Sequence, residues 1–464
     1  MTRESPGGAK AGDLQLPIEL HRAGRLAEAA AAYEELLPRL PQDPRLLLGY
    51  GTLLVQTGNL DKGLGMIDRL LALVPDHPVA WSNRGNALRA LKRQAEALAS
   101  YDRAIAAGPD YASAYYNRGA LLHELRRFDE ALRDYDRAIA LSPEFADAHW
   151  NKSLLKLITG DYEEGWRLYE WRWKGPQRGE ARSFARPLWL GEEPVRGKRL
   201  LLHAEAGLGD TIQFCRYAPL VAVLGAEVLL ELPAPLMPLL STLKGSFTLL
   251  RRGDPLPSFD MHCPLMSLPL AMKTTVASIP APVPYLFADP RKVGDWKHRL
   301  GAATLPRVGI AWSGSSIYRN DRERSLPLRL LQSVLELPIE FHVLQKEIRA
   351  EDQSALRRLA QVRTHADRLV DFSDTAALLP LMDLVVSVDT SVAHLAGAMA
   401  KAVWVLLPYA PDHRWFLDRS DSPWYPTATL LRQQKPGDWS GVVAELARRL
   451  TSFAQGGPSL PRAS

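Results

Sequence analysis

Residues 78–111, "PVAWSNRGNALRALKRQAEALASYDRAIAAGPDY", align without gaps onto residues 112–145, "ASAYYNRGALLHELRRFDEALRDYDRAIALSPEF". The chain therefore repeats with a period of 34 residues, and residues 44–77 and 10–43 fall in the same register. A degenerate unit begins at Ala146. Self-similarity at this period predicts an array of stacked helix pairs in the first third of the chain.

The recurring residue types indicate how the helices of the array pack. Small residues recur where helices must approach closely, an aromatic residue recurs as a filler, and prolines end each unit because proline cannot continue a helix. These residues are Gly51, Gly85 and Gly119; Ala97 and Ala131; Tyr33, Tyr101, Tyr135 and Tyr169; and Pro41, Pro75, Pro109 and Pro143. The pattern resembles the tetratricopeptide repeat, which implies a superhelix with a concave face that binds a protein or peptide partner.

Three asparagines, Asn83, Asn117 and Asn151, occupy the same place in consecutive repeats. Stacked helices would align their amides, and an amide can hydrogen-bond in both directions to an extended peptide. O-linked N-acetylglucosamine transferases, which this array resembles, carry such an asparagine row. The alternative is that these residues are polar surface groups or caps of local turns.

Composition limits the classes of function. A chain of 464 residues predicts two or three domains, and a net charge of +5 without a compact basic tract gives little support for nucleic-acid binding. Cys215 and Cys263 lie far apart and match neither a metal-site spacing nor a disulfide framework. The first ten residues lack an apolar signal segment, and no apolar run is long enough to span a membrane. We expect a cytoplasmic protein.

After the repeats, strand-like and helix-like segments alternate. "RLLLHA", "AEVLLEL", "FTLL" and "FDMHC" form one set; "RVGIAWSGS", "EFHVLQKE", "RLVDFS", "DLVVSVDTS" and "AVWVLLP" form another, after a helical bridge near 290–300. Such alternation predicts parallel sheets flanked by helices, so the fold class is α plus α/β. We expect a disordered start (1–9), repeats (10–173), a linker (174–198) in which Trp189 is an anchor, two α/β halves (199–289 and 290–455) and a disordered tail (456–464).

The first motif with chemical potential is "GLGDTIQF", after the first strand. Gly207 and Gly209 permit close backbone approach on the acceptor side, and Asp210 stands where a helix near Thr211 would start. Asp210 is either a helix cap or a general base that faces a cleft between the halves. The dinucleotide fingerprint is absent because Ile212 occupies its third glycine position.

The second motif is "SVDTSVAHLAGAMAKAVWVLLP", residues 387–408. A strand delivers Asp389, Thr390 and Ser391 to the first turn of a helix, where free N–H groups attract anions. His394 follows three residues after Ser391 and therefore projects from nearly the same side. A lone helical histidine is often structural, but this set of donors suits a diphosphate.

A third cluster, "WSGSSIYRNDRERSLPL", follows the first strand of the second half. Ser313 and Gly314 can form a donor-rich turn, and three guanidinium groups suit phosphate oxygens. These belong to Arg319, Arg322 and Arg324. The alternative is a solvated charge run.

"GLGDTIQF" and the 387–408 motif together resemble the heptosyltransferases, glycosyltransferase family nine, over roughly residues 199–450. The resemblance implies a glycosyltransferase-B fold, a nucleotide-diphosphate sugar as co-substrate, inversion at the anomeric carbon and no metal or other cofactor. It also implies that Asp210 is the catalytic base and that Asp389, Thr390, Ser391 and His394 bind the diphosphate. Ser391 replaces the family's usual glycine, and the family's lysine has no clear match, so Arg324 is the substitute.

Three functions remain open. The chain is a sugar transferase whose repeats recruit an acceptor such as a protein; or a non-catalytic sensor of nucleotide sugars; or a repeat adaptor whose second part only stabilises a complex.

Overall fold

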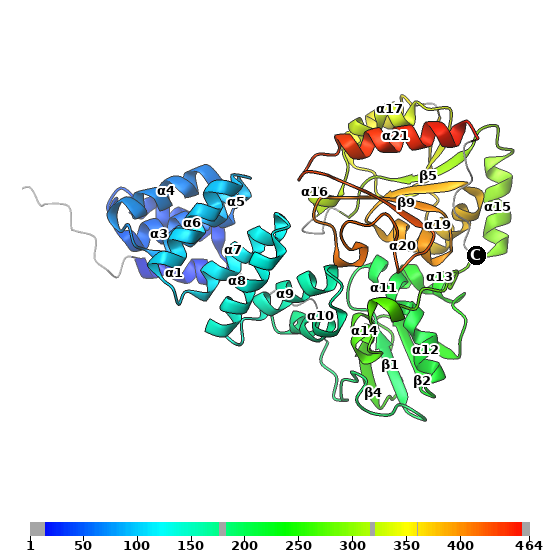
Figure 1. The fold of residues 1–464 in the computed structure, drawn as a ribbon, viewed down its shortest axis with the longest axis horizontal. Coiled ribbons are helices and arrows are strands. Elements are labelled where there is room, and N and C mark those ends of the chain that lie inside the picture. The colour runs from blue at the N-terminus through cyan, green and yellow to red at the C-terminus, as the bar shows by residue number, and fades with distance from the viewer. Residues whose placement is uncertain (1–13, 176–181, 316–320, 360, 457–464) are drawn as a thin grey trace, which may run out of the picture. The chain divides into compact units, whose positions relative to one another are not determined.

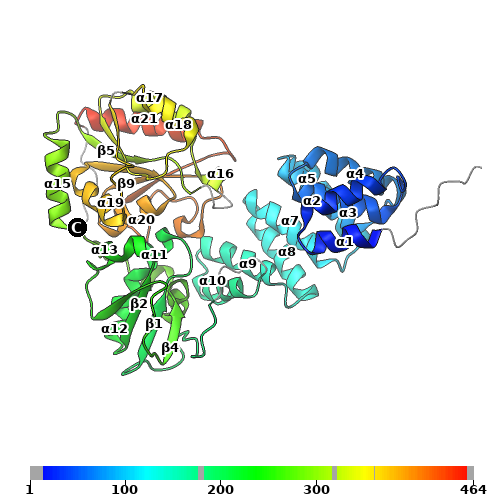
Figure 2. The same ribbon diagram turned by 180° about the vertical axis from the view of Figure 1, so that it is seen from behind.

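The computed structural model describes residues 14–175, 182–315, 321–359 and 361–456. These residues form two compact units that divide between Lys152 and Ser153. The first, the repeat unit, is helical throughout, and the second, the α/β unit, contains parallel sheets (Figures 1 and 2).

The helices of the repeat unit follow one another as antiparallel pairs. They are α1 (Gln15–Arg22), α2 (Leu26–Leu36), α3 (Pro44–Gln56), α4 (Leu60–Leu73), α5 (Pro78–Ala90), α6 (Gln94–Ala107), α7 (Ala112–Glu124), α8 (Phe128–Leu141) and α9 (Ala146–Ile158), the last of which crosses the boundary. Pro44 occupies the first position of α3, and the Asp43 carboxylate accepts the backbone N–H groups of Arg45 and Leu46, which would otherwise be unpaired at the helix start.

The recurring small residues are explained by helix contacts within each pair. A Cβ placed on Gly85 would overlap the ring of Tyr101, and one on Gly119 would lie 3.0 Å from Cε1 of Tyr135. Both tyrosine side chains are fully buried. A large ring therefore fills the space that each glycine leaves, which fixes the distance between the paired helices.

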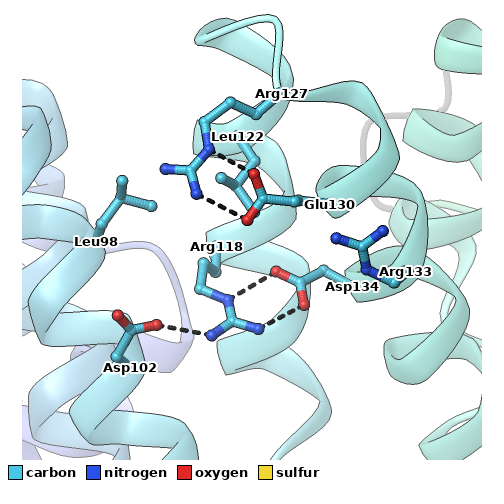
Figure 3. A pocket seen from close by; sticks show the side chains of 8 residues that line it. All are labelled: Leu98, Asp102, Arg118, Leu122, Arg127, Glu130, Arg133 and Asp134. Carbon is cyan, nitrogen blue, oxygen red and sulfur yellow. Dashed lines mark hydrogen bonds and ion pairs between the residues drawn. The ribbon is translucent and has the colours of Figure 1, made fainter.

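Cations also link successive repeats at a constant sequence spacing. The side chains of Arg84, Arg118 and Lys152 form ion pairs with Asp68, Asp102 and Asp136, respectively, each at 2.7–2.9 Å. Arg118 additionally makes a two-pronged contact with Asp134. Arg118 and its two carboxylate partners are among the side chains that line a cavity of about 200 Å³ between α6, α7 and α8 (Figure 3). The lining contains three arginines and three carboxylates, so the cavity carries no strong excess of either charge.

After the end of α9, the α/β unit continues with α10 (Tyr162–Tyr169) and a short 3₁₀ turn (Glu170–Trp173). Its first half is a four-stranded parallel sheet with the order β3-β2-β1-β4. The strands are β1 (Arg199–His203), β2 (Glu227–Leu232), β3 (Phe247–Arg251) and β4 (Met261–Pro264), and the helices are α11 (Leu208–Phe214), α12 (Ala218–Val223), α13 (Met237–Leu240) and α14 (Leu268–Ala271). Trp189 is buried, and its backbone N–H donates to the His262 oxygen of β4 at 2.8 Å, so the segment before β1 is anchored to the sheet.

The second half is a six-stranded parallel sheet with the order β10-β9-β8-β5-β6-β7. Its strands are β5 (Arg307–Ala311), β6 (Glu340–Val343), β7 (Val362–Thr364), β8 (Leu384–Val388), β9 (Val403–Leu407) and β10 (Ala428–Arg432). Its helices are α15 (Pro290–Leu300), α16 (Asp321–Arg324), α17 (Gln332–Leu335), α18 (Ala350–Leu356), α19 (Phe372–Leu378), α20 (Ser391–Ala398) and α21 (Ser440–Ala454).

Two features of this sheet differ from the prediction. "RLVDFS" is not a strand, because Asp371 caps α19 and the chain pairs earlier, at β7. The edge strand β10 was not predicted, since its short sequence "ATLLR" has neither strict alternation nor a long apolar run.

A buried arginine joins the two halves. Arg216, beside α11, donates to the backbone oxygens of Pro280 and Trp424 at 3.1 and 2.8 Å and to the hydroxyl of Tyr285 at 2.8 Å. The rings of Tyr285, Trp424 and Tyr425 pack around its guanidinium group. The first half is therefore held against the loop that precedes β10.

Gly85→Ala should destabilise the repeat unit by about 1–3 kcal/mol, because the new methyl group meets the Tyr101 ring in a packed contact. Gly65→Ala in α4 is the matched control: no atom lies within 4 Å of its added Cβ, so higher helix propensity should stabilise by up to about 1 kcal/mol. Urea denaturation followed by circular dichroism at about 222 nm, where helices absorb, measures both. Equal effects of the two substitutions would contradict the packing argument.

Candidate functional site

The two halves meet where α11 and α20 begin, just after the carboxyl ends of β1 and β8 (Figures 1 and 2). A Cβ on Gly209 would lie 2.8 Å from Cδ2 of His394 and 3.3 Å from Cα of Ser391. Gly209 therefore permits two helix starts to touch. It lies inside α11, which begins at Leu208 and not near Thr211, since Gly207 already occupies the capping position.

Asp210 is held on both of its carboxylate oxygens. Oδ2 accepts the backbone N–H of Gly207 at 2.8 Å, which completes the first turn of α11. Oδ1 forms an ion pair with the guanidinium of Arg414, from the loop after β9. The side chain remains 20% exposed, so Asp210 is both a helix-start acceptor and a link between the halves.

Arg414 lies in a buried, charged turn. Its Nη1 is 3.1 Å from Oδ1 of Asp412, and its backbone N–H donates to the same oxygen at 3.0 Å. Burial would raise the pKa of Asp412, but Arg414 and His413 outweigh it and lower that pKa to about 2. Burial likewise opposes the charge on Arg414, yet Asp412 and Asp210 raise its pKa above the usual range. Nε of Arg414 is buried and has no hydrogen-bond partner among the described residues.

Asp389 and His394 form the inner wall of the site. Burial, reinforced by the nearby negative charge of Asp412, raises the pKa of Asp389 to about 6. Burial lowers the pKa of His394 well below its usual value, so the imidazole is neutral. Its Nδ1 hydrogen-bonds the hydroxyl of Tyr425 at 3.0 Å, and its Nε2 is 3.7 Å from Oδ1 of Asp389. Both ring nitrogens thus face protein groups.

Thr390 and Ser391 form the start of α20. Thr390 is the capping residue but makes no side-chain cap; its hydroxyl lies 3.1 Å from the Ser387 hydroxyl instead. Ser391 is the first helical residue and is partly exposed. A helix start without a side-chain cap attracts negative charge through its N–H groups.

The third cluster is partly brought to the same place. Arg324 donates from Nη1 to the backbone oxygen of Asp389 at 2.9 Å, and Gly314 lies so close to Arg324 that a Cβ there would overlap its guanidinium. The Ser313 hydroxyl accepts from Gln345 at 3.0 Å and thus shapes the turn. Arg322 is exposed to solvent, and Arg319 lies outside the described residues.

The asparagine row is occupied by bonds between repeats. Each amide nitrogen donates to a hydroxyl on the first helix of the preceding repeat: Asn83 to Thr52 at 2.8 Å, Asn117 to Ser82 at 3.0 Å and Asn151 to Tyr116 at 3.2 Å. The sequence predicts surface caps or peptide ligands at these positions, and it does not predict this bonding between adjacent repeats. Each amide nitrogen carries two N–H groups and the bond between repeats uses one of them, so the second N–H and the amide oxygen are left to meet a peptide.

The sequence predicted Asp210, Asp389 and His394 but missed Arg414, Asp412 and Tyr425. All three missed residues follow β9, and ligands of parallel α/β sheets bind beyond the carboxyl ends of strands. The charged "DHR" triplet in the loop "YAPDHRWFLDRSDSPWYP" could therefore have indicated site residues. The contact of Arg414 with Asp210 depends on a pairing across 204 residues, which no local pattern encodes.

Comparisons with known proteins confirm the repeats. Two family models described as tetratricopeptide repeat match residues 112–145 and 48–112. Protein FlbA of Caulobacter vibrioides is 26% identical to this chain over 327 residues, covering 64% of this chain and 54% of FlbA. This chain thus spans about half the length of the curated relative that it matches. The matched share is larger than the repeat unit, so the similarity extends into the α/β unit.

Among solved structures, a thermophilic TPR protein of Thermus thermophilus is 24% identical, with a TM-score of 0.34, and the match covers 36% of this chain and 93% of that one. A structure titled MamA is 22% identical, with a TM-score of 0.30, covering 34% of this chain and 92% of that one. None of the described helices has the length and apolar character that crossing a membrane requires. Within the described ranges, no group of three or more His, Cys, Asp or Glu side chains is arranged to hold a metal ion.

The raised pKa of Asp389 predicts a pH dependence of stability. The folded state holds this proton more tightly than the unfolded state, whose pKa is near 3.8, so the contribution of Asp389 to the free energy of unfolding should fall as the pH rises from about 4 to about 6, whereas the buried neutral His394 and His413 contribute with the opposite sign. Above pH 6 the charged, buried carboxylate should cost about 1–3 kcal/mol. Asp389→Asn should therefore remove this contribution, so that the stability of the variant relative to wild type increases between about pH 4 and about pH 6, as measured by urea midpoints from tryptophan fluorescence.

Asp367→Asn, at an exposed carboxylate, is the control and should follow the wild-type profile. Parallel profiles for wild type and Asp389→Asn would show that Asp389 does not carry the buried proton.

Proposed function

We propose that the α/β unit is a glycosyltransferase that moves a sugar from a nucleotide-diphosphate donor to an acceptor hydroxyl, by inversion and without a metal ion. The observation that supports this most is the meeting of Asp210, Arg414 and the uncapped start of α20 between the two halves. A general base, a buried cation and an anion-binding helix start are the parts that displacement of a diphosphate requires.

The donor's diphosphate would bind at the start of α20. Arg414 brings a guanidinium charge that Asp412 and Asp210 maintain, and Arg324 brings a second cation to the turn through its bond to the Asp389 oxygen. Guanidinium groups bind phosphate oxygens in pairs, which suits this role better than a point charge does. The two arginines would supply the positive charge that neutralises the leaving diphosphate.

In the proposed reaction, the acceptor oxygen attacks the anomeric carbon while Asp210 takes its proton. The bond from that carbon to the diphosphate oxygen breaks, and the electron pair leaves with the nucleoside diphosphate. The negative charge that develops lies against the N–H groups of α20 and the two arginines. His394, neutral and bound to Tyr425, orients the turn from behind.

A non-catalytic sensor of nucleotide sugars is the second candidate. The observation in its favour is that both oxygens of Asp210 are already engaged, by Gly207 and Arg414. In this alternative, Asp210 only fixes Arg414 for diphosphate binding. The two candidates predict the same ligand and differ only in turnover.

The repeats support a further part of the proposal. Tetratricopeptide repeats form surfaces for protein interaction, so we propose that the repeat unit recruits a protein partner, which in the transferase case is the acceptor or its carrier. The second N–H and the amide oxygen of Asn83, Asn117 and Asn151 are the groups of the row left to meet it.

Thermal stabilisation by a panel of nucleoside diphosphates and their sugars, with EDTA present, tests the donor site. One nucleotide series should raise the Tm, and Arg414→Gln should weaken its affinity about 10–100-fold, because a charge-assisted contact to phosphate is lost. Arg448→Gln, at an exposed side chain of α21, is the matched control and should bind normally. Absence of any shift at millimolar ligand would refute both candidates.

Asp210→Asn then separates the transferase from the sensor. In a transferase, the variant should bind the nucleotide but lose about 10²–10⁴-fold in turnover, the usual contribution of a general base. Release of nucleoside diphosphate from the donor sugar, measured with the acceptor present, reports that turnover. If wild type and variant both bind but neither turns over with any acceptor, the sensor is favoured.

A further inference from the structure

Helix α10, the last helix of the repeat sequence, belongs to the α/β unit and presents an aromatic face to it. Tyr162, Trp166 and Tyr169 are spaced by four and three residues, so they lie on one side of the helix. All three are buried, with exposures of 2%, 2% and 5%. No other repeat helix carries this triplet in the sequence.

The aromatic face contacts the loop that contains Arg414. The ring of Trp166 meets that of His413 edge-on at 5.7 Å, and Tyr169 lies 5.9 Å from the same imidazole. Burial lowers the pKa of His413 to about 4, and its neutral ring packs against both aromatic residues, whose own rings are 5.6 Å apart. His413 is flanked by Asp412 and Arg414, the ion pair that reaches Asp210.

The other end of α10 holds the same loop at Phe416. Tyr162 stacks on the Phe416 ring at 5.8 Å with an angle of 16° between the planes, and its hydroxyl accepts from Nε1 of Trp424 at 3.1 Å. Phe416 has a φ of +56°, in the left-handed region that a bulky residue avoids at a cost of about 1–3 kcal/mol. Such a conformation persists only where neighbouring groups enforce it. The stack of Tyr162 is one of them.

We propose that α10 is the positioning element of the candidate site: Trp166 and Tyr169 pack on His413, Tyr162 packs on Phe416, and the turn between them delivers the Arg414 guanidinium to Asp210. These contacts at the two ends of α10 are called the clamp. Tyr169 also interacts electrostatically with Arg414 and Asp210, whereas the ring contacts with the loop are made by all three aromatic residues. They act through the loop, and they make the end of the repeat sequence a component of the site. The consequence for donor binding rests on the proposed function, whereas the clamp itself does not.

The clamp can be tested by amide hydrogen exchange of residues 409–424 in the full chain, read by mass spectrometry. Trp166→Leu should speed exchange there about three- to tenfold, because it removes the edge-on ring contact. Trp166→Phe, which keeps a ring, should restore most of the protection. Trp439→Phe, at a buried tryptophan of the second half away from the loop, should leave these residues unchanged.

A second measurement reports on Arg414 itself. Modification by phenylglyoxal, mapped by mass spectrometry, should become several-fold faster at Arg414 in Trp166→Leu, while Arg307, which is also buried but pairs with Glu340 away from the loop, reacts at an unchanged rate. A purely structural loss of stability would not single out one arginine. If Trp166→Leu does not fold, Tyr162→Leu, at the other end of the clamp, is measured in its place.

Unchanged exchange and unchanged Arg414 reactivity in a folded variant would overturn the proposal. If nucleoside diphosphates fail to bind the wild type, the donor site is wrong, but both measurements still decide whether α10 positions the loop. If they bind, the same variants should weaken that binding in step with the exposure of Arg414.

Discussion

The arrangement of the α/β unit depends on one buried cation. Arg216 is enclosed by three aromatic rings and donates to oxygens from both sides of the junction between the halves. A buried charge costs several kcal/mol unless its donors are satisfied. The carbonyl oxygens of Pro280 and Trp424 must therefore stay in place together, which sets the distance at which α11 meets α20. Gly209 can touch His394, and Asp210 can reach Arg414, only at that distance.

A second constraint comes from the repeat sequence. In the repeat unit, a large ring is matched by a glycine in its partner helix, as with Tyr101 and Gly85. In α10 the same kind of ring packs instead on the loop after β9. The degenerate character of the last repeat has this physical reason: Trp166 and Tyr162 are suited to an α/β partner rather than to another helix pair. The sequence period ends where the packing partner changes.

This difference explains what the sequence could and could not predict. The helix pairs of the repeat unit were predictable because their contacts are local and recur every 34 residues. Most strands were predictable as apolar runs, but β10 and the position of β7 depend on pairing with distant strands. In the site, Asp210 and Asp389 stand in recognisable motifs. Arg414, Arg216 and α10 act through contacts between distant segments, which spacing does not reveal.

The engagement of Asp210 does not by itself decide against a catalytic role. An ionised carboxylate has about four acceptor positions, and the bonds to Gly207 and Arg414 use part of that capacity. The side chain remains one-fifth exposed, so an acceptor hydroxyl can approach the remaining positions. The bond to Gly207 fixes the carboxylate on the first turn of α11, and Arg414 fixes it across the halves. An aspartate held in this way is oriented before an acceptor arrives, which is the condition that efficient general-base catalysis requires.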